Sequence, residues 1–190
     1  MSKRVFISTS TFAQFSRKPL EMMELLGINY TLNTKGRKLT KNEIFKIIPH
    51  YDYVLAGTET YDVDVLNNAK NLKIISRIGI GLDNIDLDYA SEKKIKIIRT
   101  KTTPAVAVSE LTIALILNLL RKIHQQNIDY NSHRWVKKMG SLFHNKTLGV
   151  IGLGKIGKEL VRILRGFNLK IIAFDLHEDK SFSDKYCVDY

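Results

Sequence analysis

The stretch Gly149–Leu160, GVIGLGKIGKEL, decides the fold that we expect for this chain of 190 residues. It overlaps an apolar run, TLGVIG, that is typical of a buried strand, and it leads into KELVRILRGF, an amphipathic helical pattern. Glycine-rich turns are common, but this order of strand, turn and helix is the context in which such a turn binds phosphate groups. We therefore predict a dinucleotide-binding turn, against the alternative of a glycine turn that serves only the packing of helix on strand.

Each glycine of this turn has its own task in a dinucleotide-binding site. We expect Gly152 to permit the tight turn, Gly154 to let the backbone approach the pyrophosphate, and Gly157 to let the helix pack closely on the strand. The N–H groups of Lys155 and Ile156 then point at the anionic bridge from the positive end of the helix dipole. For Lys155 we expect the backbone to bind the phosphates while the side chain stays in solvent.

The carboxylate at the end of the next strand predicts which dinucleotide is bound. The run LKIIAFD ends in Asp175, eighteen residues after Gly157. A carboxylate at this place accepts hydrogen bonds from the ribose hydroxyls of adenosine and repels a 2′-phosphate. Because no Arg follows directly, the sequence favours NAD over NADP.

Short apolar runs alternate with helical patterns through the first hundred residues. This alternation is typical of repeated βαβ units and a parallel sheet. We therefore expect an α/β fold, with a flavodoxin-like parallel-sheet lobe at 1–103 followed by an interdomain helix and a truncated Rossmann dinucleotide-binding domain at 104–190. The expected strands lie near 4–8, 28–32, 52–56, 73–77 and 95–99, and the expected helices near 18–26, 40–49, 62–69 and 86–93.

A long apolar helix is expected over 104–126, because Pro104 suits a first helical turn and basic residues gather near the far end. Such a helix bridges two lobes or packs in a dimer. Glu110 within it is expected to have a hydrogen-bonded structural or hinge role rather than to act as a catalytic carboxylate. The following run, NSHRWVKKMG, is expected to form a short helix with Trp135 as a packing anchor.

The composition limits the possible partners and the compartment. The chain is 44% hydrophobic with a formal net charge of +11, and no basic arm or block stands out, so we do not expect a nucleic-acid interface. The single cysteine, Cys187, can form no internal disulfide, which indicates a reducing compartment and predicts a cytoplasmic protein. The longest apolar run, AVAVSELTIALILNLL, falls short of a membrane span.

Four stretches of the sequence match a known family in order and spacing. They are VLAGTETYDVDVLNNAKNLKII (54–75), SRIGIGLDNIDLDYASEKKI (76–95), AVAVSELTIALILNLLR (105–121) and RWVKKMGSLFHNKTLGVIGLGKIG (134–157). With these stretches the chain resembles the D-isomer-specific 2-hydroxyacid dehydrogenases and is most similar to their phosphoglycerate dehydrogenase branch. The helix run departs from the family pattern at Ser109, where alanine is usual.

The resemblance implies an NAD-dependent oxidoreductase that acts on the CH–OH group of a D-2-hydroxy acid, with residues 1–103 as its substrate lobe. It implies that backbone N–H groups of Gly79, Ile80 and Gly81 hold the substrate carboxylate, a task that suits successive amides in a glycine loop. The alternative is a simple strand-ending turn in which Asp83 and the following Asn84 form local hydrogen bonds. Arg77 either assists an anionic substrate or pairs at the surface, and both readings stay open.

Oxidation of a 2-hydroxy acid needs a base for the hydroxyl proton and a cation for the carboxylate. The resemblance implies that an Arg, and a His oriented by a Glu, serve these tasks from the later part of the cofactor domain. We assign no catalytic residue and no metal ligand, because no histidine of this chain falls in that context. These histidines are His50, His124, His133, His144 and His177.

We therefore expect the chain to be a truncated, N-terminal portion of such an enzyme, inactive alone, with two nucleotide-domain strands, apolar surface and an open sheet edge. The expected partners are a small anionic 2-hydroxy or 2-keto acid and either a second copy, bound through the 104–126 region, or a missing C-terminal segment. The alternative function is a non-catalytic NAD(H)-sensing or dimerisation module.

Overall fold

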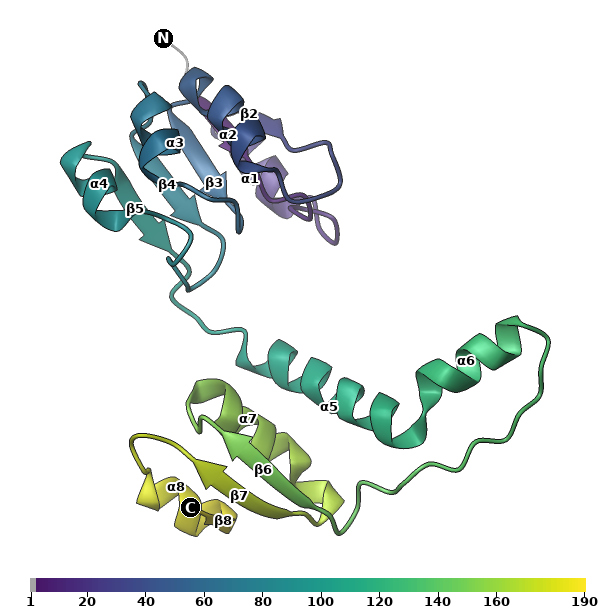
Figure 1. Cartoon of the computed structure of the whole chain (residues 1–190). Coiled ribbons are helices and arrows are strands. Elements are labelled where there is room, and N and C mark those ends of the chain that lie inside the picture. Colours follow the sequence, from purple (N-terminus) through teal and green to yellow (C-terminus); the bar gives the residue numbers. More distant parts are fainter. Residues whose placement is uncertain (1–2) are drawn as a thin grey trace. The chain divides into compact units, whose positions relative to one another are not determined.

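The computed structural model describes residues 3–190 of the chain, which divides into two compact units. Unit 1 comprises Met1–Thr102 and unit 2 comprises Thr103–Tyr190. Both units are built from parallel strands with helices between them (Figure 1). This architecture confirms the expected α/β class.

Unit 1 contains a five-stranded parallel sheet in the order β2-β1-β3-β4-β5. This is the flavodoxin-like order that we expected, and its strand order reverses between β1 and β3. Ligands of open parallel sheets bind outside the carboxyl ends of the strands at such a reversal. The strands are β1 (Arg4–Ile7), β2 (Asn29–Leu32), β3 (Tyr53–Ala56), β4 (Ile74–Arg77) and β5 (Lys96–Arg99).

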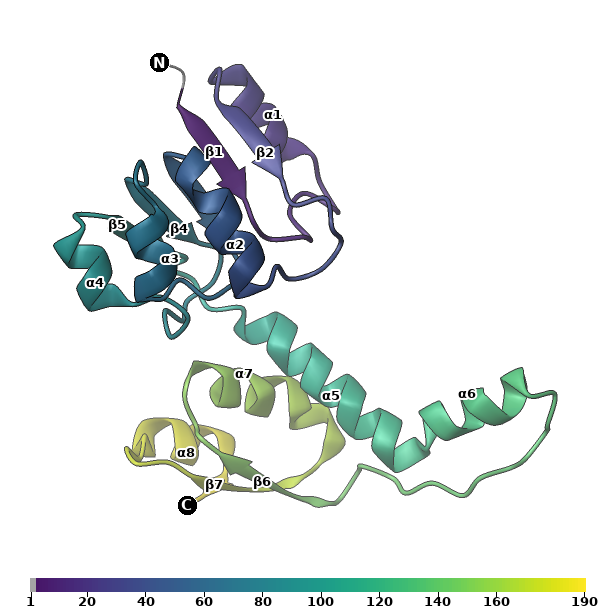
Figure 2. The same cartoon turned by 45° about the horizontal axis from the view of Figure 1, so that its top comes forward.

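The helices of unit 1 follow the predicted pattern. Thr40, Asp62 and Asp86 each accept a hydrogen bond from a first-turn N–H, so side chains fix where α2, α3 and α4 begin. These three helices lie on one face of the sheet (Figure 2). A buried core that includes Ile44 and Ile75 packs between the helices and the sheet. The helices are α1 (Lys18–Leu25), α2 (Lys41–Ile47), η1 (Ile48–His50), α3 (Val63–Asn68) and α4 (Leu87–Glu92).

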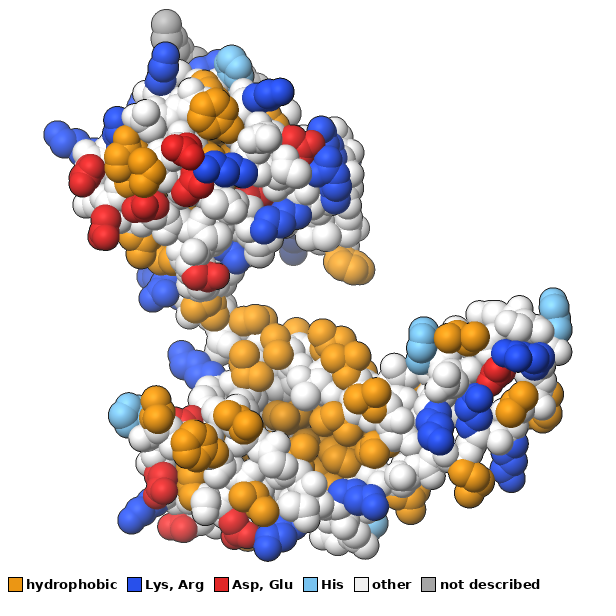
Figure 3. Space-filling view, in the orientation of Figure 1, with side chains coloured by type: hydrophobic (Ala, Val, Ile, Leu, Met, Phe, Trp, Pro, Cys, Tyr) orange, Lys and Arg blue, Asp and Glu red, His pale blue; other side chains and the backbone are white. Residues whose placement is uncertain are grey.

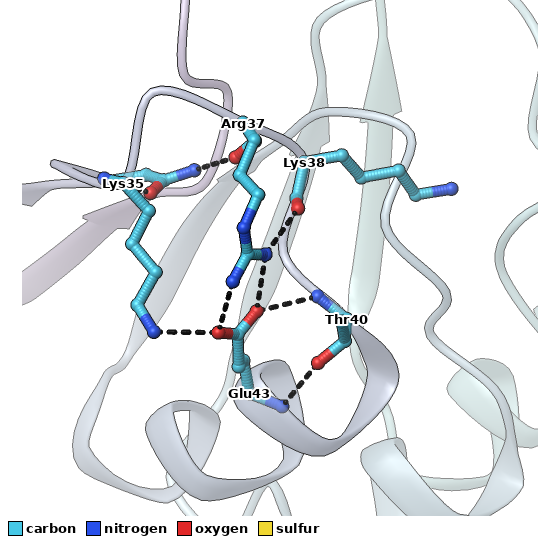
Figure 4. Close-up of polar contacts among 6 residues, drawn as sticks. Lys35, Arg37, Lys38, Thr40 and Glu43 are labelled. Atoms are coloured by element: carbon cyan, nitrogen blue, oxygen red, sulfur yellow. Dashed lines mark hydrogen bonds and ion pairs between the residues drawn. The ribbon is translucent and has the colours of Figure 1, made fainter.

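The loop that leads into α2 is held by one carboxylate. Glu43 accepts a hydrogen bond from Lys35 Nζ at 2.6 Å, from Arg37 at 2.8 and 2.9 Å, and from the Thr40 N–H at 2.8 Å (Figure 4). These donors hold the pKa of Glu43 far below its ordinary value, with the Arg37 guanidinium as the largest cause. The Lys38 side chain extends away from this network (Figure 4).

Unit 2 contains a three-stranded parallel sheet in the order β6-β7-β8. A core that includes Val150, Val161 and Ile171 lies between this sheet and α7. A second cluster, around Leu164, packs α7 and its 3-10 extension against α5. The elements are α5 (Ala105–Arg121), α6 (Ile123–Asn131), β6 (Thr147–Ile151), α7 (Lys155–Ile163), η2 (Leu164–Phe167), β7 (Lys170–Phe174), α8 (Lys180–Tyr186) and β8 (Val188–Asp189).

The prediction of one helix over 104–126 is wrong. The helix breaks at Lys122, which adopts a left-handed conformation with φ of 54°, and α6 begins at the next residue. The Asn118 side chain stabilises the break, because its Oδ1 accepts a hydrogen bond from the His124 N–H at 2.9 Å. Glu110 is exposed on α5 and its side chain has no hydrogen-bond partner in residues 3–190, so the expectation of a hydrogen-bonded side chain is also wrong, while a hinge role stays a prediction.

Two further expectations for unit 2 need correction. Residues 133–143 form an extended arm without helix or strand, and Trp135 on it is 91% exposed, so it anchors no packing. Asp129 on α6 holds this arm through ion pairs to Arg134 at 2.8 Å and Lys138 at 2.9 Å. The sheet also has three strands instead of two, because β8 pairs with β7 beyond α8.

Unit 2 exposes much apolar surface, as we expected (Figure 3). One face of its sheet is uncovered, since Ile151 is 89% exposed and Phe174 is 63% exposed. A second apolar row follows α5 at Leu111, Leu115 and Leu119, one turn apart. In the part of the chain that the structure describes, no helix combines the length and apolarity that a bilayer crossing requires.

Candidate functional sites

The glycine turn of unit 2 joins β6 to α7 with a backbone that side chains would disturb. Gly152 has a φ of +90°, which glycine adopts without strain, and its N–H donates to the Phe174 carbonyl at 2.7 Å. A Cβ added to Gly157 would lie closer to the Gly152 carbonyl oxygen than van der Waals contact allows. The structure thus places these two glycines where a tight turn and a close helix need them.

The first turn of α7 presents free backbone donors. Gly154 is the N-cap and has no side chain to accept from them, and the helical hydrogen bonds begin with the Lys158 N–H, which donates to the Gly154 carbonyl at 2.9 Å. The N–H groups of Lys155 and Ile156 find no acceptor in residues 3–190. The space around a Cβ at Gly154 is open to 4 Å, so a ligand can approach the backbone there. Free donors at a helix N-terminus suit an anion such as a diphosphate.

Asp175 follows β7 directly and faces this turn. Its Oδ2 accepts the Leu153 N–H at 2.6 Å and its Oδ1 accepts the His177 N–H at 3.0 Å. These backbone hydrogen bonds, with that of His177 the largest cause, lower the pKa of Asp175 below its ordinary value. The carboxylate is therefore ionised and oriented beside the turn, as recognition of ribose hydroxyls requires. The residues after it, LHEDK, include no Arg.

The glycine loop of unit 1 lies beyond the carboxyl end of β4. Gly79 has a φ of +153°, a conformation that disfavours other residues. The Arg77 guanidinium donates to the Ile78 carbonyl, and the Arg99 guanidinium donates to the Ile80 carbonyl at 3.2 Å. In a trans peptide the C=O and the following N–H point in opposite directions. The peptide bond between Ile80 and Gly81 therefore directs the Gly81 N–H away from Arg99.

Two of the three expected donors of this loop are free. The N–H groups of Ile80 and Gly81 have no acceptor in residues 3–190, whereas the Gly79 N–H donates to Thr100 Oγ1 at 3.1 Å. Successive amides of a turn bind anions in many proteins, so these two N–H groups are available for a carboxylate. The Gly79 N–H is already paired, and this residue instead supplies the backbone conformation of the loop.

Arg77 forms no ion pair with a carboxylate of residues 3–190, and one nitrogen of its guanidinium donates to the Ile78 carbonyl. Its Nε is buried and has no hydrogen-bond partner in the described residues. The side chain lines a cavity of about 580 Å³ together with Lys38, Thr58 and Asn84. The strand-ending-turn alternative is wrong for Asn84, because its Nδ2 reaches across to the Glu59 carbonyl at 2.6 Å.

Three buried residues at the carboxyl ends of β1 and β3 were not expected from the sequence. Ser8, Glu59 and Tyr61 are buried and hydrogen-bonded to one another through the Ser8 hydroxyl. The signal available in the sequence was weak: the polar run GTET follows the strand YVLA directly, at an end where ligands bind. Residues 3–190 contain no group of three His, Cys, Asp or Glu side chains placed to hold a metal ion.

These features define a class of protein. A flavodoxin-like unit, followed by a unit with a parallel strand, glycine turn, helix and strand-ending Asp, is an α/β architecture with a Rossmann-like second unit. The family model for the D-isomer specific 2-hydroxyacid dehydrogenase catalytic domain matches residues 11–179. The chain belongs to this family, which confirms the resemblance found in the sequence.

Curated relatives agree with this assignment. The chain is 40% identical to a hydroxypyruvate reductase of Thermotoga maritima over 158 residues, which cover 82% of this chain and 52% of that protein. It is 31% identical to a D-3-phosphoglycerate dehydrogenase of Archaeoglobus fulgidus over 163 residues, 84% of this chain and 30% of that protein. The chain thus spans about half of the first relative and less than a third of the second.

Solved structures share the fold. The apo structure of D-lactate dehydrogenase from Escherichia coli matches with a TM-score of 0.81 at 26% identity and covers 99% of this chain and 59% of that one. D-lactate dehydrogenase of Aquifex aeolicus, complexed with NAD and lactic acid, matches with a TM-score of 0.73, covering 96% of this chain and 54% of that one. At 20% identity this second likeness shows the fold alone.

Proposed function

We propose that this chain forms the substrate lobe and the NAD-binding turn of an oxidoreductase that acts on the CH–OH group of a D-2-hydroxy acid. Unit 1 serves as the substrate lobe and unit 2 as the first part of the cofactor domain. The observation that carries this proposal is the turn of unit 2, where free N–H groups of Lys155 and Ile156 and the ionised Asp175 lie together in a chain of this family. NAD, when bound, supplies the hydride acceptor.

The residues of unit 2 bind and orient the cofactor. The N–H groups at the start of α7 hold the diphosphate, and the open space at Gly154 lets the backbone approach it. The Asp175 carboxylate accepts hydrogen bonds from the ribose hydroxyls and repels a 2′-phosphate, so the site prefers NAD to NADP.

The residues of unit 1 hold the substrate. The free N–H groups of Ile80 and Gly81 bind the carboxylate of a small 2-hydroxy or 2-keto acid. The backbone conformation of Gly79 lets the loop turn so that these groups reach the ligand. Arg77 and Lys38 line the cavity beside the loop together with the carboxylates of Asp62, Asp83 and Asp86, so the charge of this cavity does not by itself select the side group of the substrate. We assign the proton transfers of the reaction to no residue of this chain.

Calorimetric titration of the folded chain with NADH and NADPH tests the proposal. The wild-type chain is expected to bind NADH more tightly than NADPH. Asp175→Ala is expected to weaken the affinity for NADH by about tenfold or more, because charge-assisted hydrogen bonds to ribose are lost. The difference in affinity between NADH and NADPH is expected to shrink as well. Asp184→Ala, which removes an exposed carboxylate from α8, is the matched control. A folded wild-type chain that gives no heat with NADH refutes the proposal.

A second candidate function is a dimerising, NAD(H)-sensing module without catalysis. The apolar row of Leu111, Leu115 and Leu119 along α5 favours it, since exposed rows of this kind mark protein interfaces. In this function two copies associate through the α5 and α6 region, and NADH changes that association without turnover. Sedimentation with and without NADH tests it, and turnover of a 2-hydroxy acid by the same sample excludes it.

A further inference from the structure

A buried carboxylate lies where β1 and β3 end in unit 1. Glu59 is 2% exposed, and its Oε2 accepts hydrogen bonds from Ser8 Oγ at 2.6 Å and from the Gly57 N–H at 3.0 Å. None of the ion pairs within residues 3–190 involves it. Burying a carboxylate that has no cationic partner is costly, so hydroxyl and amide donors must hold it firmly.

The donors around this carboxylate join two strands. Ser8 follows β1 directly and is fully buried, and its Oγ also accepts from the Gly57 N–H at 3.1 Å and from the Tyr61 hydroxyl at 3.3 Å. Gly57 follows β3 directly. The cluster therefore ties the ends of β1 and β3 at the reversal of strand order, where ligands of such sheets bind.

A second set of bonds passes from this cluster to the glycine loop. Asn84 Nδ2 donates to the carbonyls of Glu59 at 2.6 Å and Gly57 at 3.3 Å. The Tyr61 N–H donates to the Asn84 carbonyl at 2.8 Å, and the Asp86 N–H donates to the Tyr61 carbonyl at 2.9 Å. The segment that contains the buried carboxylate is thus cross-linked to the segment that presents the free amides.

We propose that Glu59 is a positioning residue for binding of the substrate carboxylate. Its side chain fixes residues 57–61, and these in turn hold Asn84 so that the N–H groups of Ile80 and Gly81 stay directed at the ligand. Glu59 acts through Asn84 without touching the ligand. The inference rests on the proposed function, because it takes the glycine loop as the substrate site.

Pyruvate, the smallest common 2-keto acid, is the probe, and its binding is followed by chemical shifts of the Ile80 and Gly81 amides. Glu59→Ala removes the 2.6 Å acceptor of the Ser8 hydroxyl, which keeps the Leu55 carbonyl at 3.3 Å, and it removes one of the two acceptors of the Gly57 N–H. The loss of these two hydrogen bonds is expected to weaken pyruvate binding by about tenfold. Glu59→Gln keeps an acceptor oxygen and the side-chain shape and is expected to stay within about twofold of wild type.

Two further variants separate positioning from general stability. Ile44→Val removes one methyl group from the same core without touching the loop, and its pyruvate affinity is expected to equal that of wild type. Asn84→Ala breaks the cross-link while leaving the buried carboxylate in place. Asn84→Ala is expected to weaken pyruvate binding as much as Glu59→Ala does. If Glu59→Ala does not fold, Asn84→Ala alone tests whether the cross-link supports pyruvate binding.

Amide hydrogen exchange gives a readout without ligand. The Tyr61 and Asp86 amides are expected to exchange about tenfold faster in Glu59→Ala and to be unchanged in Ile44→Val. Wild-type binding of pyruvate that Glu59→Ala and Asn84→Ala both leave unchanged overturns this inference alone. The absence of any pyruvate-dependent shift at Ile80 and Gly81 in wild type overturns the substrate loop together with it, while NADH binding at the turn of unit 2 still tests the cofactor site.

Discussion

The absence of a side chain at Gly157 allows α7 to pack closely against the glycine turn of unit 2. The helix α7 begins two residues before it and passes so close to the glycine turn that a methyl group would overlap the Gly152 carbonyl. That approach sets the position of the Lys155 and Ile156 amides, because they lie in the same first turn. Anion binding at the turn therefore depends on a residue whose own atoms need not touch the ligand.

Gly157→Ala is expected to destabilise unit 2 by about 1–3 kcal/mol, the usual range for an overpacked site. It is also expected to weaken the binding of NADH. Gly166→Ala is the matched control, since a Cβ there meets nothing within 4 Å and its φ is not positive. Urea unfolding and NADH titration of both variants measure the effects. Equal stability of the two alanine variants would contradict the close approach seen here.

The network around Glu43 predicts a pH dependence. Hydrogen bonds from Arg37, Lys35 and the Thr40 N–H lower the pKa of Glu43 in the folded chain, so its stabilising effect is present above the unfolded pKa of about 4.3 and is lost as the pH falls through the folded pKa. Arg37→Met is expected to raise the pKa of Glu43 towards its ordinary value. The acid-induced loss of stability below about pH 5 then shrinks.

Carboxyl chemical shifts followed during an acid titration measure that pKa directly. Arg17→Met is the control, because the Arg17 guanidinium lies 3.6 Å from Glu24 and away from this network. A Glu43 titration that moves equally in the two variants, or in neither, would show that the Arg37 contacts do not hold the carboxylate in solution.

At the residue scale, local chemistry was predictable from the sequence and long-range pairing was not. The geometries of Gly152 and Gly157 follow from turn and packing requirements within ten residues of sequence. The Asn84 contact joins residues 25 apart, and the contact of Ser8 with Glu59 joins residues 51 apart. No local pattern encodes such pairs, because they arise when two strand ends meet in the folded sheet.

At the scale of the element, all five strands and four α-helices of unit 1 were predictable within about two residues, a usual margin for element boundaries. The alternation of short apolar runs with helical patterns gave a clear signal. The break between α5 and α6 was missed, because LLRKIHQQ carries neither glycine nor proline and Lys122 takes the left-handed conformation that glycine usually supplies. The Asn118 side chain stabilises that break through its hydrogen bond with the His124 N–H.

The exposed row on α5 predicts self-association. Leu115→Lys places a charge in the centre of this row and is expected to lower the dimer fraction in sedimentation velocity, because apolar burial would be lost. The equivalent change at Leu25, an exposed position on α1 of unit 1, is the control. A wild-type chain that stays monomeric at every concentration tested would show that the row serves another contact.

At the scale of the whole molecule, the sequence predicted the fold class and the family, and both are confirmed. The two units form their cores separately, from different sets of residues. Each proposed binding region lies within one unit, the glycine loop in unit 1 and the glycine turn in unit 2. Binding of a keto acid and of a dinucleotide can therefore be measured independently on the same chain.

The extended arm carries the one tryptophan of the sequence, and solvent surrounds its indole. Indole emission moves to shorter wavelength when water is replaced by apolar groups, so this side chain is an intrinsic optical probe of whatever covers the arm. Binding of a second copy, or of any other protein, over the arm is expected to shift the Trp135 emission maximum to shorter wavelength in an unlabelled sample. Ligand binding confined to unit 1 is expected to leave the emission spectrum unchanged.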